Sequence, residues 1–179
     1  LISNVASVML ATLFSITNLN VVAQGLETRV ITGKISDGEH PIANVAVTDG
    51  QNIVTTDENG CYSIKTSVNT RFVYITTPAG YVVPVKDKTI PQFYQHLETD
   101  KNTYDFKLTK NQYNDNNHTF VVHSDVQVTS TDDINQYKTI IDDCRNTINK
   151  TKGDVFGIDC GDIVGDSPQL YPNYIETVS

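Results

Sequence analysis

Short apolar runs alternate with turn-forming residues through the first half of the chain. The alternation predicts strands at residues 30–36, 43–48, 53–56, 62–65, 72–76 and 101–108. Asp37-Gly38, Asp49-Gly50 and Asp57-Glu58-Asn59-Gly60 separate the early runs, and Asn-Gly tolerates the positive φ that a tight turn needs. Short strands with turn residues between them predict a β-sandwich domain over residues 26–108.

The pattern changes in the second half, at residues 118–179. Residues 119–123 and 154–158 are apolar runs typical of buried strands. The stretch between them carries helix-start residues and then an apolar stripe at helical spacing, made of Ile134, Tyr137, Ile140, Ile141, Cys144 and Ile148. Strand, helix and strand in this order predict a βαβ unit with a parallel pair of strands. The polar, Asn-rich residues 109–117 read as a linker between the two halves.

The first 24 residues contain no charged side chain. A short apolar run at residues 5–13 and small residues before Gln24 match the apolar core and cleavage site of a secretory signal peptide, here without its initiator Met and basic start. We therefore expect a secreted or periplasmic protein. The run is too short for a membrane span, so we expect no integral span in the mature chain. The alternative is a buried N-terminal helix.

Composition narrows the possible functions. The chain has 179 residues, 39% of them hydrophobic, which fits a globular protein. Its net charge of −8 argues against a nucleic-acid-binding surface and against docking on anionic lipid. The three cysteines, Cys61, Cys144 and Cys160, lack CxxC spacing, so no disulfide framework or zinc ribbon is predicted. We expect them to be free or buried, with one disulfide between two of them as the alternative in an oxidising compartment.

Two acidic residues follow the ends of the two predicted parallel strands. Asp125 comes just after the first strand, and Asp162 just after the second. In open α/β sheets ligands bind at the carboxyl ends of the strands, and adjacent strands lie about 4.8 Å apart. Two carboxylates this close repel each other unless a cation lies between them. Gly161 allows a sharp turn before Asp162. The pattern favours a metal site over the alternative of two acids that merely cap turns.

The first half resembles carboxypeptidase-regulatory-like and transthyretin-like domains. The resemblance rests on three segments, at residues 33–38 (GKISDG), 41–50 (PIANVAVTDG) and 56–64 (TDENGCYSI). More narrowly, it is similar to the domain that precedes some calcineurin-like phosphoesterases, which implies an accessory role without chemistry of its own. Asp49, Asp57 and Glu58 are candidates for a calcium site, but turn-forming acids that face water are the favoured interpretation.

The second half resembles the start of a calcineurin-like metallophosphoesterase domain. That family has D-x-H after its first strand and G-D after its second, and this chain has Asp125-Val126-Gln127 and Gly161-Asp162. The resemblance implies that Asp125 binds the first of two divalent ions (iron, zinc or manganese) and that Asp162 bridges both. Gln127 stands where the family commonly has His, and its amide oxygen is a weaker ligand. The implied reaction is attack of a metal-bound hydroxide on the phosphorus of a phosphoester substrate.

The later motifs of that family do not occur in the sequence. Neither G-N-H-[DE], which supplies the catalytic His, nor G-H-x-H is present, and His40, His96, His118 and His123 lie outside such motifs. No catalytic residue is therefore assigned. We expect the chain to be an N-terminal fragment in which residues 118–179 form only the start of the catalytic domain. We expect this fragment to be inactive by itself. Neither the substrate nor the oligomeric state is predicted.

Two other functions compete with this one. Residues 125–129 (DVQVT) resemble the first motif of haloacid-dehalogenase-like phosphatases, but Gln127 replaces the second Asp of that motif. The other candidate is a non-catalytic module that binds a glycan or another partner through the β-sandwich. The sequence shows no clustered aromatic platform for a glycan, although Tyr74, Tyr81, Phe93 and Tyr94 are candidates.

Overall fold

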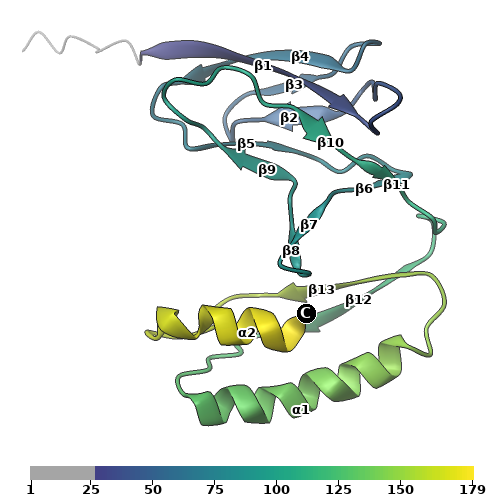
Figure 1. Cartoon of the computed structure of the whole chain (residues 1–179), viewed down its shortest axis with the longest axis vertical. Helices are drawn as coiled ribbons and strands as arrows, with labels where there is room; N and C mark the ends of the chain where they lie inside the picture. The colour runs from purple at the N-terminus through teal and green to yellow at the C-terminus, as the bar shows by residue number, and fades with distance from the viewer. Residues whose placement is uncertain (1–26) are drawn as a thin grey trace, which may run out of the picture.

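The computed structural model describes residues 27–179, so the predicted signal peptide lies outside the described residues. The first half forms two larger sheets and two short strand pairs (Figure 1). One has the order β10-β1-β4, with β1 at Thr28–Ser36, β4 at Cys61–Ser67 and β10 at Phe106–Lys107. Strand β1 runs antiparallel to β4 and parallel to β10.

The other sheet has the order β3-β2-β5-β9 and is antiparallel throughout. Its strands are β2 at Ala46–Thr48, β3 at Ile53–Thr55, β5 at Phe72–Ile75 and β9 at Tyr94–His96. The predicted strands are therefore present with shifted ends, and the N-terminal half is mostly β-strand, as expected. The predicted last strand at residues 101–108 is reduced to β10 and one isolated bridge between Thr103 and Thr32.

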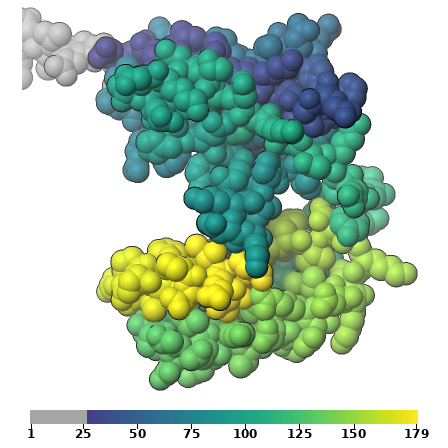
Figure 2. Space-filling view, viewed as in Figure 1, coloured from purple at the N-terminus to yellow at the C-terminus, as the bar shows by residue number. Residues whose placement is uncertain are grey.

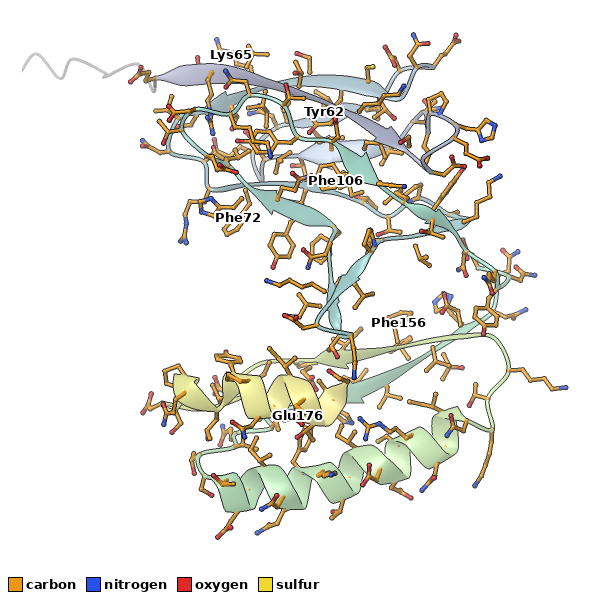
Figure 3. The ribbon with its side chains drawn as sticks, viewed as in Figure 1. Tyr62, Lys65, Phe72, Phe106, Phe156 and Glu176 are labelled. Carbon is orange, nitrogen blue, oxygen red and sulfur yellow. The ribbon has the colours of Figure 1, made fainter. Side chains whose placement is uncertain are left out.

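A shared core holds the two sheets together. Alternate residues of each strand point inward, as the two-residue period of a strand requires. Buried residues from both sheets form the cluster, which contains Ile31, Ile35, Ile42, Val45, Val47, Tyr62, Ile64, Val73, Ile75, Leu97, Tyr104, Phe106 and Leu108. Figure 3 shows Tyr62 and Phe106 in this core. The Tyr62 hydroxyl donates a hydrogen bond to the carbonyl oxygen of Tyr104 at 2.6 Å, so a buried polar group is satisfied inside the core.

Short strand pairs follow the second sheet. Strand β6 at Tyr81–Val82 pairs with β11 at Thr109–Lys110, so two residues expected in the linker are in a strand. The reason is that this segment finds backbone partners on β6. Strands β7 at Val85–Lys86 and β8 at Ile90–Pro91 form a hairpin that extends to the second half (Figure 2). At its tip Thr89 and Ser179 share a hydrogen bond of 2.8 Å between their hydroxyls.

The second half consists of two strands and the helices beside them. Strand β12 at His118–His123 and strand β13 at Asp154–Asp159 pair in parallel, from His118 opposite Asp154 to His123 opposite Asp159. Helix α1 at Thr131–Ile148 connects them and lies on the side away from the two sheets (Figure 1). A 3-10 turn, η1 at Pro168–Leu170, leads into helix α2 at Tyr171–Val178, which packs on α1.

Helix α1 begins with a capping box. The backbone N–H of Asp133 donates to the Ser130 hydroxyl, and the Asp133 carboxylate accepts the backbone N–H of Ser130. Ile134, Tyr137 and Ile141 are buried against α2, as the apolar stripe predicts. Ile140 was expected on the same stripe but is 54% exposed. It follows Ile134 by six residues, which places it about 120° around the helix from Ile134.

The other side of the strand pair, away from α1, is apolar and open within residues 27–179. Phe120 is 53% exposed, Val122 50%, Phe156 46% and Ile158 43%. These residues alternate with the more covered positions of β12 and β13. The apolar sequence of these strands predicted that they are buried. They are partly exposed because other elements cover only one side of the pair.

Candidate metal centre

The carboxyl ends of β12 and β13 lie side by side, and the loops that follow them stay together. The backbone N–H of Cys160 donates to the carbonyl oxygen of His123 at 2.9 Å. Further along, the N–H of Gln127 donates to the carbonyl oxygen of Asp162 at 2.7 Å, and Val128 donates to Ile163 at 3.0 Å. The two loops that carry Asp125, Gln127 and Asp162 are therefore joined by backbone hydrogen bonds. This brings the three predicted ligand positions to one edge of the sheet.

All three positions have left-handed backbone. The φ angles are +43° at Asp125, +46° at Gln127 and +39° at Asp162. Non-glycine residues rarely adopt this region, although Asp and Asn tolerate it better than others. Such a conformation costs on the order of 1–3 kcal/mol per residue and is most often found at functional sites. Three of them at the ends of two adjacent strands mark this edge as locally strained.

The side chains at these three positions, Asp125, Gln127 and Asp162, are exposed and have no hydrogen-bond or ion-pair partner within residues 27–179. Carboxylate and amide oxygens are hard donors that suit divalent cations such as Mn²⁺. The donor set is partial, because no group of three or more His, Cys, Asp or Glu side chains in the described residues is arranged to hold a metal ion. The chemistry of the donors fits a divalent ion, and their number does not complete its coordination.

A polar cluster that the sequence did not reveal lies beside these loops. His123 Nδ1 is 3.0 Å from Asp159 Oδ1 and 2.9 Å from the Tyr137 hydroxyl, and its Nε2 is 3.6 Å from Cys144 Sγ. Tyr174 donates a hydrogen bond to the other oxygen of Asp159, and its ring stacks on Tyr137 with centroids 6.0 Å apart. These contacts tie both strand ends to α1 and α2, in agreement with a structural role for His123.

The same cluster raises the pKa of two tyrosines. Burial is the larger cause for both Tyr137 and Tyr174, and the negative charge of Asp159 adds to it. Both phenols therefore stay neutral at physiological pH and can donate hydrogen bonds to their partners. The sequence signal for this cluster is the register that places His123 opposite Asp159, which becomes visible only once the strands are paired.

The acidic turn residues of the first half bind their own turns. Asp57 Oδ1 accepts the backbone N–H groups of Asn59 and Cys61, and Asp49 Oδ1 accepts those of Gln51 and Asn52. This is the behaviour of turn-forming acids. Asp49, however, is only 8% exposed, so the expectation that it faces water was wrong. Its hydrogen bonds explain how it can be buried.

The three cysteines are free. Cys61 and Cys160 are exposed, and Cys144 is half-buried. The expectation that the cysteines are free or buried is met, because all three are unpaired. In the described residues no helix has the length and apolar character needed to cross a membrane.

Comparison with known families supports a relation to phosphoesterases. Residues 29–111 match the family model described as the N terminal of calcineurin-like phosphoesterase. No match to the chain was found among curated proteins. The matched segment covers the two larger sheets of the first half and ends just after β11, before the second half begins at residue 118. The first half is therefore similar to the N-terminal domain of calcineurin-like phosphoesterases, a class of hydrolases that generally use divalent metals.

Proposed function

We propose that this protein acts in metal-dependent hydrolysis of phosphoesters, as part of a calcineurin-like metallophosphoesterase. The observation that supports this most is the hydrogen bond between Gln127 and Asp162, because it joins the two loops expected to hold metal. The family match to the first half adds independent support, since it concerns other residues. It also favours this class over a haloacid-dehalogenase-like phosphatase, whose first motif is broken at Gln127.

In this proposal the first half is a β-sandwich with an accessory role. The β12, α1 and β13 elements are the first βαβ unit of the catalytic domain, with the right-handed crossover that such units adopt. The cluster of His123, Asp159, Tyr137 and Tyr174 holds the carboxyl ends of both strands in place. Strand ends that are fixed in this way can present ligands in a constant arrangement.

The proposed metal ligands are Asp125, Gln127 and Asp162, with Asp162 shared between two ions of iron, zinc or manganese. The two carboxylates supply the negative charge that attracts the cations, and the Gln127 amide supplies a neutral oxygen. Such ions, when bound, lower the pKa of a water molecule so that hydroxide is available near neutral pH. We propose that this chain alone does not hydrolyse phosphoesters, because its described residues offer too few ligands and no assigned catalytic His.

Metal titration tests the ligand assignment. Binding of Mn²⁺ and of Zn²⁺ to the chain is measured by isothermal titration calorimetry, for the parent and for Asp125→Asn and Asp162→Asn. Asn is chosen because it keeps the side-chain shape and tolerates positive φ. We expect each substitution to weaken binding by about tenfold or more, since a charged ligand is lost. The control is Asp143→Asn, which removes an exposed carboxylate on α1 and should bind like the parent.

Two outcomes would contradict the ligand assignment. One is a parent chain that binds neither ion. The other is that Asp125→Asn and Asp162→Asn both bind the ions with the same affinity as the parent. The proposed inactivity has its own assay, hydrolysis of p-nitrophenyl phosphate with added Mn²⁺ or Zn²⁺. Turnover by this chain that is abolished in Asp162→Asn would refute the proposal that it is inactive while supporting the ligand role.

We also propose a secreted or periplasmic location, on the basis of the uncharged and partly apolar residues 1–24. Expression with its natural start in a bacterial host, followed by N-terminal sequencing of the exported protein, tests this. A mature protein that begins near Gln24 supports export, and a protein found only in the cytoplasm with these residues intact argues against it.

A further inference from the structure

Strands β5 and β9 carry a group of aromatic side chains on the outer face of their sheet. Val73 and Ile75 of β5 point into the core, so Phe72 and Tyr74 point outward. The pairing places Phe72 opposite His96 and Tyr74 opposite Tyr94, and these partners share the outer face. Figure 3 shows Phe72 on this face, away from the core. No clustered platform is visible in the sequence, because the residues of β5 and those of β9 lie about twenty positions apart and come together only when the two strands pair.

The rings contact one another edge to face. The centroids of Phe72 and Tyr94 are 5.8 Å apart at 77°, and those of Phe72 and His96 are 5.1 Å apart at 83°. Phe93, which is 39% exposed, packs on Tyr94 in the same way, at 5.4 Å. Phe72, Tyr74 and Tyr94 are half-buried and His96 is exposed. The aromatic group therefore forms a fixed surface that solvent still reaches.

A hollow of about 410 Å³ borders this surface. The turn between β2 and β3 and the turn between β4 and β5 form its walls, and Phe72 and Tyr74 form one side. The remaining lining is polar and consists of Asp49, Gln51, Ser67, Asn69, Thr70 and Arg71. This volume is in the range of pockets that bind small molecules, and aromatic walls with a few polar groups are their usual lining.

Several polar groups of the hollow are free to bind a ligand. Within the described part of the chain, the side chains of Gln51, Asn69 and Arg71 make no hydrogen bond to another residue. The Arg71 guanidinium lies 5.5 Å from the centroid of the Phe72 ring, a cation–π contact that leaves its N–H groups available. Asp49, which also lines the hollow, is buried and accepts hydrogen bonds from the N–H groups of its own turn. One carboxylate and one guanidinium give the lining no net formal charge.

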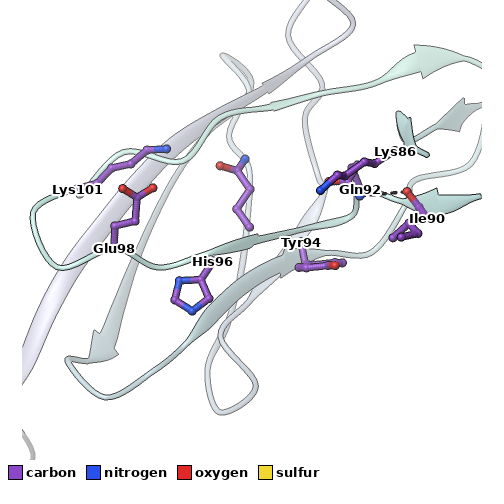
Figure 4. Close-up of a pocket in the computed structure, with 8 residues that line it drawn as sticks. Lys86, Ile90, Gln92, Tyr94, His96, Glu98 and Lys101 are labelled. Carbon is purple, nitrogen blue, oxygen red and sulfur yellow. Dashed lines mark hydrogen bonds between the residues drawn. The ribbon is translucent and has the colours of Figure 1, made fainter. Parts of the chain in front are cut away.

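A second hollow touches the same aromatic group. Tyr94 and His96 line a space of about 390 Å³ beside β9, together with Gln92, Gln95 and other residues (Figure 4). The Gln92 amide donates to Ile90 and the Gln95 amide donates to Asp105, which fixes both side chains. The aromatic surface therefore has a hollow beside each of its two strands, and the walls of the second one also carry the charged side chains of Lys86, Glu98 and Lys101. A ligand longer than one ring could contact both.

We propose that the outer face of β5 and β9, with the hollow next to Phe72 and Tyr74, binds a neutral oligosaccharide. Sugar rings have apolar C–H faces that stack on aromatic rings, and hydroxyl groups that both donate and accept hydrogen bonds. Half-exposed rings beside free amide and guanidinium groups match both properties. The hollow next to Phe72 and Tyr74 has no net formal charge in its lining, and the chain as a whole has a net charge of −8, so an acidic glycan or a phosphate is disfavoured there. This binding site is separate from the candidate metal centre and does not depend on it.

A glycan array followed by calorimetry tests the proposal. The whole chain is applied to an array of neutral and acidic oligosaccharides, and the best neutral one is then titrated into the parent and two variants. Phe72→Ala and Tyr74→Ala each remove one ring of the surface, and we expect each to weaken binding by about tenfold. Tyr113→Ala is the control, because Tyr113 is 56% exposed and lies outside both hollows. Circular dichroism of each variant verifies the fold.

Each possible result either supports or refutes the proposed oligosaccharide site. Binding of a neutral oligosaccharide that both ring deletions weaken and Tyr113→Ala does not would support the site. If Phe72→Ala fails to fold, Arg71→Ala takes its place, since it removes free donors from the same hollow without touching the core. Selective binding of acidic glycans, binding that survives in all ring and Arg71 variants, or an array without any neutral ligand would each overturn the proposal. None of these readouts depends on phosphoester hydrolysis.

Discussion

Replacement of Gly33 by alanine tests how closely the chain is packed around this glycine. Gly33 lies in β1 opposite Tyr62. A methyl group at this position would overlap with the carbonyl oxygen of Tyr104 and lie 2.6 Å from Cε1 of the Tyr62 ring. That carbonyl oxygen accepts the hydrogen bond from the Tyr62 hydroxyl. The substitution therefore pushes β1 away from both the buried Tyr62 ring and the backbone at Tyr104.

The cost follows from three contributions. Overpacking of a core typically costs about 1–3 kcal/mol. Displacement of the Tyr62 hydroxyl from its acceptor costs about 1 kcal/mol more. Alanine gains about 0.5–1 kcal/mol over glycine in a strand, because it loses less backbone entropy on folding. We therefore expect Gly33→Ala to lower the free energy of unfolding by about 1–3 kcal/mol, which corresponds to a fall in melting temperature of roughly 5–20 °C for a domain of this size.

Gly157→Ala is the matched control. Gly157 also lies in a strand, but no atom lies within 4 Å of the position that its methyl group would take. We expect this variant to be as stable as the parent or up to about 1 kcal/mol more stable. Urea denaturation followed by far-ultraviolet circular dichroism measures all three proteins. If Gly33→Ala unfolds at the same urea concentration as Gly157→Ala, the argument from close packing is refuted.

Three further predictions concern hydrogen bonds and pH. Ser130→Ala removes the cap of α1 and should cost about 1 kcal/mol in urea denaturation. The pKa of Asp133 lies below its ordinary value of 3.8, because the backbone N–H of Thr129 and then other groups donate to it, so the stability that it adds is present above pH 3.8 and is lost as the pH falls further. Burial raises the pKa of Tyr62, Tyr137 and Tyr174 above the ordinary value of 10.0, so their stabilising effect is present below pH 10.0 and is lost as the pH rises. Phenolate absorbance should show these three tyrosines ionising later than the rest, and simultaneous ionisation of all tyrosines would contradict this.

The periodic parts of the fold were predictable from the sequence. Alternating apolar residues identified β1 and β4, since each needs only its own two-residue period. Helix α1 was predicted from its helix-start residues and apolar stripe, because both signals are local, and the structure adds the capping box between Ser130 and Asp133. Ile140 was misplaced, since a list of apolar residues at helical spacing did not compare their angles around the helix.

Features that depend on strand pairing were out of reach. The contact of His123 with Asp159 requires the parallel register of β12 and β13, and the aromatic group around Phe72 requires the pairing of β5 with β9. The sequence predicted that Asp125 and Asp162 follow adjacent strands, and the paired loops agree with that expectation. Whether their side chains hold metal remains a prediction for the titration above.

The left-handed backbone at residue 127 also bears on how this chain would respond to selection for thermal stability. Glutamine has a long side chain and lacks the tolerance for positive φ that glycine and asparagine have, so either of these should stabilise the loop there. A library screened only for heat resistance should therefore enrich glycine or asparagine at this position. Glycine would remove the side-chain oxygen altogether and asparagine would shorten its reach, so a more robust protein would be obtained at the expense of a proposed ligand.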